Sequence, residues 1–190
     1  MYHIKPFSNA YPPFINWDDA FNSEELDHIQ NLAKKASIEG KVGDNAQVVD
    51  SIRRSKISWI QDTEDNIFIF DRLANVVNQI NADYYHFSLH SFAESIQLTN
   101  YDFSEQGHYS WHQDIGHAHS RKLSLVLQLS DPKEYEGGNL QILIKSEPET
   151  IRKQRGGITV FPSWALHRVT PVVSGNRQTL VAWVTGERFK

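Results

Sequence analysis

His112 and Asp114 stand one residue apart in the run Trp111-His112-Gln113-Asp114. On an extended backbone, side chains two residues apart point to the same side. An imidazole nitrogen and a carboxylate oxygen can therefore reach one metal ion from a single strand end. The pair alone is a weak signal, because chance also produces this spacing.

A third ligand has to come from elsewhere in the chain. His108, His117 and His119 are close in sequence, but the two that follow Asp114 lie in a glycine-containing turn, where we expect them to face solvent or substrate. We favour His167, which opens a strand-like run after a loop that contains proline. A lone histidine in such a place is more often structural than a ligand, so the residues that follow it matter.

Arg177 begins an apolar run in which polar and apolar side chains alternate. On a strand, Leu180, Ala182 and Val184 would face one way, and Arg177, Thr179, Val181 and Trp183 the other. A buried arginine is costly without a partner. Most such arginines pair with an acid or lie at an edge; the alternative is that this one binds the carboxylate of a ligand, which a guanidinium group holds with two parallel hydrogen bonds.

Two histidines and one carboxylate on one face of a metal leave three adjacent positions open, as in the facial triad of non-haem Fe(II) oxygenases. A 2-oxo acid could chelate the iron through its keto acid end and place its far carboxylate on Arg177. One position would remain for dioxygen.

With these residues the sequence resembles the Fe(II)/2-oxoglutarate-dependent oxygenases, in particular the prolyl-4-hydroxylase-like group that includes PKHD-type hydroxylases. The resemblance extends from Arg53 to Glu187 and rests on four motifs in matching order, at residues 101–114, 123–140, 157–162 and 167–177. It implies His112, Asp114 and His167 as iron ligands and Arg177 as the anchor of the 2-oxoglutarate C5 carboxylate.

The resemblance also implies a cosubstrate pocket. Gln128 stands where relatives often have a tyrosine whose hydroxyl contacts the same carboxylate, and its amide could still donate; Thr179 offers a hydroxyl nearby. The remaining positions that match the lining of this pocket are Tyr101, Tyr109, Leu140 and Trp183. Near the substrate entrance the matching positions are Arg121, for which an exposed strand-edge role is equally open, and Trp111, with Trp164, His117 and His119 around a groove.

The implied reaction couples decarboxylation of 2-oxoglutarate to hydroxylation of a substrate, with Fe(II) as cofactor, dioxygen as oxidant and ascorbate in support. Group resemblance favours a prolyl residue in a peptide or protein; a free amino acid, another side chain or a nucleobase is the alternative. Two rival classes are a cupin-like metal-binding protein without oxygenase activity, which needs no Arg177, and an interaction module that kept the fold and lost activity. The presence of all four key residues argues against the second rival.

Two helices are expected before a long all-strand region. Asn22 begins the first helix. Apolar residues at helical spacing, from Ile67 through Phe70 to Ile80, predict a second helix over 64–83 in which these residues face the core. Short strands separated by turn signals, such as 174–176, follow from 86 to 185. We therefore predict a mainly β fold with supporting helices, and the resemblance implies a double-stranded β-helix (jelly roll) with N-terminal α-helices packed on one sheet. A single domain is expected over 1–190, with helical support over 1–85 and the jelly-roll core over 86–187.

Composition sets the remaining limits. The chain has 190 residues, a net charge of −4, 39% hydrophobic and 22% charged residues, which is typical of a soluble globular domain. It has no cysteine, which excludes disulfides, iron–sulfur clusters and thiol nucleophiles. The charge balance makes nucleic acid an improbable partner, and the basic cluster 152–155 is expected to be a solvated loop. With no signal peptide or membrane span in the sequence, we expect a cytoplasmic protein.

Overall fold

The computed structural model describes residues 11–35, 38–43, 47–92, 95–115 and 120–188. Within these ranges the strands form two antiparallel sheets, the larger in the order β1-β12-β8-β14-β6-β4-β2, with β5 and β9 also paired to β14, and the smaller in the order β11-β10-β13-β7-β3. The strands of the larger sheet are β1 (Ile15–Trp17), β2 (Ile38–Glu39), β4 (Lys56–Ile60), β5 (Leu89–Phe92), β6 (Ile96–Asp102), β8 (Arg121–Gln128), β9 (Tyr135–Gly137), β12 (Ile158–Pro162) and β14 (Val172–Gly186). Those of the smaller sheet are β3 (Arg53–Arg54), β7 (His108–His112), β10 (Leu140–Ile144), β11 (Glu147–Thr150) and β13 (His167–Val169). The mainly β prediction is confirmed.

Both predicted helices form. Helix α1 (Ser23–Ala33) begins with a capping box, in which the Asn22 side chain accepts a hydrogen bond from the Glu25 amide and the Glu25 carboxylate accepts one from the Asn22 amide, each at 2.9 Å. Helix α2 (Ile67–Ile80) starts later than expected and continues as a π-helical turn, Asn81–Tyr85. The prediction that Ile67 faces the core was wrong. Because Ile67 opens the first turn it is 47% exposed, and the buried stripe consists of Ile69, Leu73, Val76, Val77 and Ile80.

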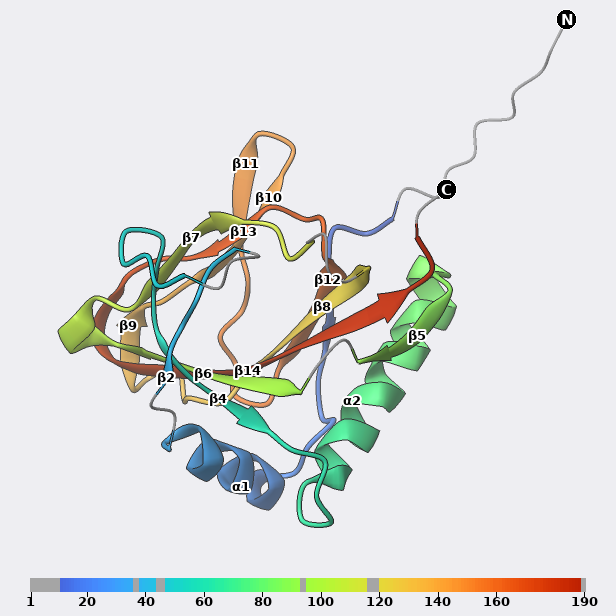
Figure 1. Ribbon diagram of the computed structural model, residues 1–190, viewed down its shortest axis with the longest axis horizontal. Helices are drawn as coiled ribbons and strands as arrows, with labels where there is room; N and C mark the ends of the chain where they lie inside the picture. The colour runs from blue at the N-terminus through green and yellow to red at the C-terminus, as the bar shows by residue number, and fades with distance from the viewer. Residues whose placement is uncertain (1–10, 36–37, 44–46, 93–94, 116–119, 189–190) are drawn as a thin grey trace, which may run out of the picture.

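The molecule has three layers (Figure 1). The buried faces of α1 and α2 join the outward residues of the larger sheet in one hydrophobic cluster, which includes Leu98, Leu125 and Leu180. A second cluster, which includes Val126, Leu140 and Phe161, lies between the two sheets. The functional residues described below lie beside this second cluster, on a scaffold that is packed on both sides.

Strand β14 crosses the centre of the larger sheet. The turn predicted at 174–176 was wrong, because the chain continues as a strand there. Gly175 adopts φ +70°, which lets the strand change register and pair first with β9 and then with β6 and β8. As the alternation predicted, Leu180, Ala182 and Val184 lie in the helix-facing cluster, and the opposite set faces the smaller sheet. The strands β1, β2, β3, β5, β9 and β11 were not predicted.

The basic cluster 152–155 forms a partly exposed loop, as expected, and its two arginines pair with acidic residues. Arg152 forms an ion pair with Asp18 at 2.6 Å, and Arg155 forms one with Asp27 at 2.7 Å. These pairs connect the chain after β11 to the segment around α1. No helix in the described part of the chain is long and apolar enough to cross a membrane.

Candidate functional site

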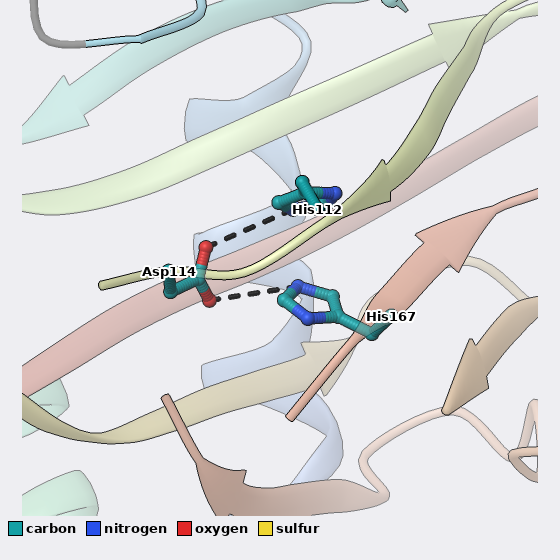
Figure 2. A group of neighbouring side chains, drawn as sticks. All are labelled: His112, Asp114 and His167. Carbon is teal, nitrogen blue, oxygen red and sulfur yellow. Dashed lines mark ion pairs between the residues drawn. The ribbon is translucent and has the colours of Figure 1, made fainter. Parts of the chain in front are cut away.

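His112, Asp114 and His167 come together at the end of the smaller sheet, as Figure 2 shows. His112 ends β7, His167 begins β13, and the two residues are paired across these neighbouring strands. One ligand atom from each of the three side chains can be chosen so that all lie within 4.8 Å of one another. The Nε2 atom of His112 lies 3.7 Å from Asp114 Oδ1, and that of His167 lies 3.5 Å from Asp114 Oδ2. A metal ion would fit among these atoms.

Backbone carbonyls fix the orientation of both imidazoles. Nδ1 of His112 lies 2.8 Å from the Ser110 carbonyl oxygen, and Nδ1 of His167 lies 2.9 Å from that of Ala165. A carbonyl oxygen can only accept, so in each ring Nδ1 carries the proton and donates it. Both Nε2 lone pairs are therefore available to a metal ion. The hydrogen bond from each Nδ1 atom to a backbone carbonyl two residues earlier fixes the orientation of the ring.

The electrostatics of the site favour the deprotonated forms that bind a metal. Burial, together with the neighbouring His167, lowers the pKa of His112 to about 4. Burial acts to raise the pKa of Asp114, but His167, His112 and the Ser124 hydroxyl outweigh it, and the pKa lies below its usual value. Near neutral pH the site therefore offers a neutral His112 beside a carboxylate.

Asp114 is held by residues of the larger sheet. Its Oδ2 accepts a hydrogen bond of 2.6 Å from the Ser124 hydroxyl of β8, and Ser124 Oγ is 3.1 Å from Ser163 Oγ. Its backbone amide donates to the Ser163 carbonyl at 2.9 Å. Ser124 was not among the predicted site residues. The available signal was a small hydroxyl residue in the middle of an otherwise apolar, buried strand.

A cavity of about 700 Å³ opens between the two sheets beside this trio. Arg177, Thr179 and Trp183 line it from β14, and Tyr101 lines it from β6. The other predicted site residues in its lining are Tyr109, Leu140 and Arg121. The predicted metal ligands and most of the predicted cosubstrate residues thus share one cavity.

Arg177 is a buried cation without an acidic partner among the described residues. Its exposed fraction is 1%, and its Nη2 atom donates to Gln128 Oε1 at 3.2 Å, while Nε makes no hydrogen bond. The guanidinium carbon lies 5.3 Å from the centre of the Tyr101 ring. Since a buried charge normally has a counterion, this environment fits an anionic ligand.

Tyr135 and Lys153 are neighbours of Arg177 that sequence analysis missed. The Tyr135 hydroxyl is buried and lies close to the Arg177 guanidinium. Burial raises the pKa of Tyr135, although the positive charge of Arg177 acts to lower it. The Lys153 ammonium lies 4.6 Å from the centre of the Tyr135 ring and donates to the Gly137 carbonyl at 2.6 Å. Tyr135 lies in a motif that the sequence did show, but Lys153 carries no local signal, because its contact depends on the loop before β12.

Of the residues predicted near the substrate entrance, Arg121 lines the cavity, but Trp111 and Trp164 do not. Trp111 is not in the lining of the cavity; its indole lies under the Arg168 guanidinium, with 4.5 Å from the guanidinium carbon to the ring centre. Trp164 packs against Phe87, with 5.6 Å between ring centres. Arg121 lies over Trp183 at 4.2 Å and donates to the Asp114 carbonyl at 3.3 Å. The positions 117 and 119, predicted at the groove, lie outside the described residues.

Comparison with known proteins agrees with this geometry. The model of the 2OG-Fe(II) oxygenase superfamily matches residues 96–185, which include all three trio residues and Arg177. A PKHD-type hydroxylase of Nitrosomonas europaea is 30% identical over 171 residues, 84% of this chain and 73% of the relative. The chain belongs to the 2OG-Fe(II) oxygenase superfamily. The predicted resemblance is confirmed.

Other relatives of this chain match over shorter stretches. A PKHD-type hydroxylase of Hyphomonas neptunium is 44% identical over 62 residues, which are 33% of this chain and 28% of the relative. One of Synechococcus is 40% identical over 82 residues, 42% of this chain and 37% of the relative. The chain thus spans well under half the length of these two relatives.

Solved structures support the fold. A prolyl hydroxylase of Trichoplax adhaerens, in complex with a hypoxia inducible factor peptide fragment, superposes with a TM-score of 0.77 at 18% identity, covering 94% of this chain and 84% of that chain. A Pseudomonas putida prolyl-4-hydroxylase gives a TM-score of 0.73 at 18% identity, covering 92% and 93%. At this identity the likeness concerns the fold alone, and it agrees with the predicted jelly roll.

Proposed function

We propose that this oxygenase couples the oxidative decarboxylation of 2-oxoglutarate to the hydroxylation of a C–H bond in a prolyl residue of a peptide or protein. The observation that carries the proposal is Arg177, a buried guanidinium without an acidic partner among the described residues, in the cavity that also holds the His112, Asp114 and His167 trio. A dicarboxylate that reaches from the trio to Arg177 satisfies both ends of this arrangement.

The residues present fit the two groups that the family requires. His112, Asp114 and His167 would hold Fe(II), which supplies the activation of dioxygen when bound. Two imidazoles with free Nε2 atoms and one carboxylate are suitable donors for this ion. The orphaned Nε of Arg177 fits the distal carboxylate of 2-oxoglutarate.

Around that carboxylate the chain offers further contacts. Thr179 stands opposite Gln128 on β14 and β8 and lines the cavity. Gln128 already accepts from Arg177 through Oε1, so its amide nitrogen is the end that is left to donate to a ligand. In this proposal Gln128 orients the Arg177 guanidinium and adds a second donor to the carboxylate. The sequence had left this role of Gln128 open.

The apolar lining keeps water from the reacting centre. Leu140 is 3% exposed and Trp183 8%. Tyr109 stacks on His112 with 3.5 Å between ring centres and covers that imidazole. Excluding water strengthens the charge-assisted contacts to the carboxylate and protects the reaction from side products.

A cupin-like metal-binding protein needs the trio but has no use for a buried, unpaired Arg177. The prolyl substrate is supported by relatives named PKHD-type hydroxylases and by structural neighbours that are prolyl hydroxylases. Succinate release, measured with Fe(II), ascorbate and 2-oxoglutarate, tests both the oxygenase activity and the prolyl substrate. We expect turnover that Zn(II) inhibits and that prolyl peptides stimulate more than free amino acids or nucleosides do. Succinate release without stimulation by any prolyl peptide would remove the prolyl substrate, and no 2-oxoglutarate turnover at all would remove the oxygenase activity.

A further inference from the structure

A second buried arginine, Arg53 of β3, lines the same cavity. It is 6% exposed and pairs across the smaller sheet with Tyr109 of β7. Its guanidinium carbon lies 4.8 Å from the centre of the Tyr109 ring, which in turn stacks on His112 at 3.5 Å. Arg177 comes from the larger sheet, so each of the two sheets contributes a buried arginine to the lining of this cavity.

The partners of Arg53 are all neutral. Its Nε donates to Ser55 Oγ at 2.8 Å, and its Nη1 donates to the Lys41 carbonyl at 3.3 Å. The Nη2 atom makes no hydrogen bond to a described residue. Within the described ranges no carboxylate lies at ion-pair distance from Arg53, although Glu39 lines the same cavity. Among the described residues, the buried charge of Arg53 therefore has no counterion, which is costly unless a ligand supplies one.

The surroundings hold this guanidinium in a fixed orientation. A Cβ atom at Gly40 would lie 2.6 Å from Arg53 Nε and 2.4 Å from Ser55 Oγ, so only glycine leaves room for the hydrogen bond between them. Tyr109 covers one face of the guanidinium. A cation that is oriented before a ligand arrives loses little entropy on binding.

We propose that Arg53 binds a carboxylate group of the primary substrate, while Arg177 takes the distal carboxylate of 2-oxoglutarate. The inference rests on the proposed function, since it presumes that the substrate reacts at the trio. Only the Tyr109 ring separates Arg53 from His112, so the carboxylate belongs to the reacting residue or to its immediate neighbour. Guanidinium donors recognise a planar carboxylate better than its neutral amide.

Two sources of this carboxylate are distinguished with matched probes. N-acetylproline and N-acetylprolinamide test an α-carboxylate on the reacting residue. Acetyl-Gly-Pro-Asp-Gly-amide and its Asn counterpart test an acidic neighbour. Binding of each probe is measured by calorimetry on the full chain with 2-oxoglutarate and Zn(II), so that no turnover occurs. In one of the two pairs we expect the carboxylate member to bind at least roughly tenfold tighter, the scale of one charge-assisted hydrogen bond.

Variants assign the preference to Arg53. In Arg53→Gln we expect the preference to disappear, and in Arg53→Lys, which keeps the charge, a reduced preference to remain. The matched control is Arg54→Gln, because the neighbouring Arg54 is absent from the cavity lining and donates to the Glu105 carbonyl at 3.4 Å. Arg54→Gln should bind both probes as the unmodified chain does.

Three results would overturn the proposal: no carboxylate preference in the unmodified chain for either pair, a preference that Arg53→Gln retains, or an equal loss of both members in Arg53→Gln and Arg53→Lys, as a purely structural role predicts. Succinate release by the unmodified chain without any probe is scored separately. Its absence contradicts the proposed function, and its presence with no carboxylate preference contradicts only the role of Arg53.

Discussion

The Ser124 hydroxyl donates a 2.6 Å hydrogen bond to Oδ2 of Asp114, the oxygen that also faces His167 Nε2 at 3.5 Å. The other oxygen, Oδ1, faces His112. Each carboxylate oxygen therefore faces one imidazole, and the carboxylate cannot rotate without losing the Ser124 bond. β8 of the larger sheet thereby sets the geometry of ligands that come from β7 and β13 of the smaller one.

Ser124→Ala should weaken metal binding. Without the hydroxyl, Asp114 is free to rotate, and loss of such a supporting contact reduces metal affinity roughly 10- to 100-fold. Titration of the protein with Mn(II), followed by calorimetry, measures the change. Ser110→Ala is the control, because the Ser110 side chain bonds only to the Ser51 carbonyl. An unchanged affinity in Ser124→Ala would show that Asp114 does not depend on this bond.

Arg177→Met should separate stability from ligand binding. Removing a buried cation that lacks a counterion is expected to leave the free energy of unfolding unchanged or to raise it by about 1 kcal/mol or more. In the unmodified chain, 2-oxoglutarate at 100 times its Kd should add about 2.7 kcal/mol of stability, and in the variant it should add none. Thermal unfolding with and without 2-oxoglutarate measures both effects. If the ligand still stabilises the variant, Arg177 is not the anchor.

Gln128→Glu should imitate the bound carboxylate. A glutamate at this position places an anion beside Arg177 Nη2, so the unliganded protein should gain stability while its affinity for 2-oxoglutarate falls by roughly tenfold or more. Arg168 and Gln141 form a similar pair, with 2.8 Å from Nε to Oε1. Gln141→Glu is therefore a matched control that should leave 2-oxoglutarate binding unchanged. Equal effects of the two variants would argue against a ligand carboxylate at Arg177.

The titration of Lys153 should make the affinity for 2-oxoglutarate depend on pH. Burial and the charge of Arg177 lower the pKa of Lys153 below its usual value. Its positive charge, which favours the dicarboxylate, is fully present below that lowered pKa and is lost as the pH rises through it. Affinity should therefore decline in the alkaline range before an ordinary lysine titrates.

Lys153→Met should bind 2-oxoglutarate roughly threefold more weakly at neutral pH, as for a partly screened charge, and should lose this alkaline decline. Lys133→Met, which removes an exposed lysine, should behave as the unmodified chain does. The measurement is the Kd of 2-oxoglutarate across the alkaline range, for both variants and for the unmodified chain. An identical pH profile in Lys153→Met would assign the decline to another group.

The sequence revealed those parts of the fold and site that depend on local periodicity. Alternation along β14 placed Arg177 and Thr179 on the cavity side, and the two-residue spacing placed His112 and Asp114 together. The same rule places Trp111, next to His112, on the opposite side of β7, where it contacts Arg168. The predicted role of Trp111 in substrate binding therefore has no support from its position.

The sequence did not indicate the roles of residues that act through tertiary contacts. Ser124 of the larger sheet reaches Asp114, which follows β7 of the smaller sheet, only through the packing of the two sheets. Lys153 reaches Tyr135 only through the loop before β12. The turn predicted at 174–176 failed for a related reason, since pairing with β9 holds Gly175 in a strand. Neither strand pairing nor loop placement leaves a periodic trace in the sequence.

The most direct test of the central claim is succinate formation under oxygen-18 gas. With Fe(II), ascorbate and 2-oxoglutarate, we predict that the protein releases succinate carrying one labelled oxygen atom, detected by mass spectrometry. His167→Ala and Asp114→Ala should release none while remaining folded, as judged by circular dichroism. Unlabelled succinate, or labelled succinate at the same rate from either variant, would contradict the assignment of His112, Asp114 and His167 as the centre that activates dioxygen.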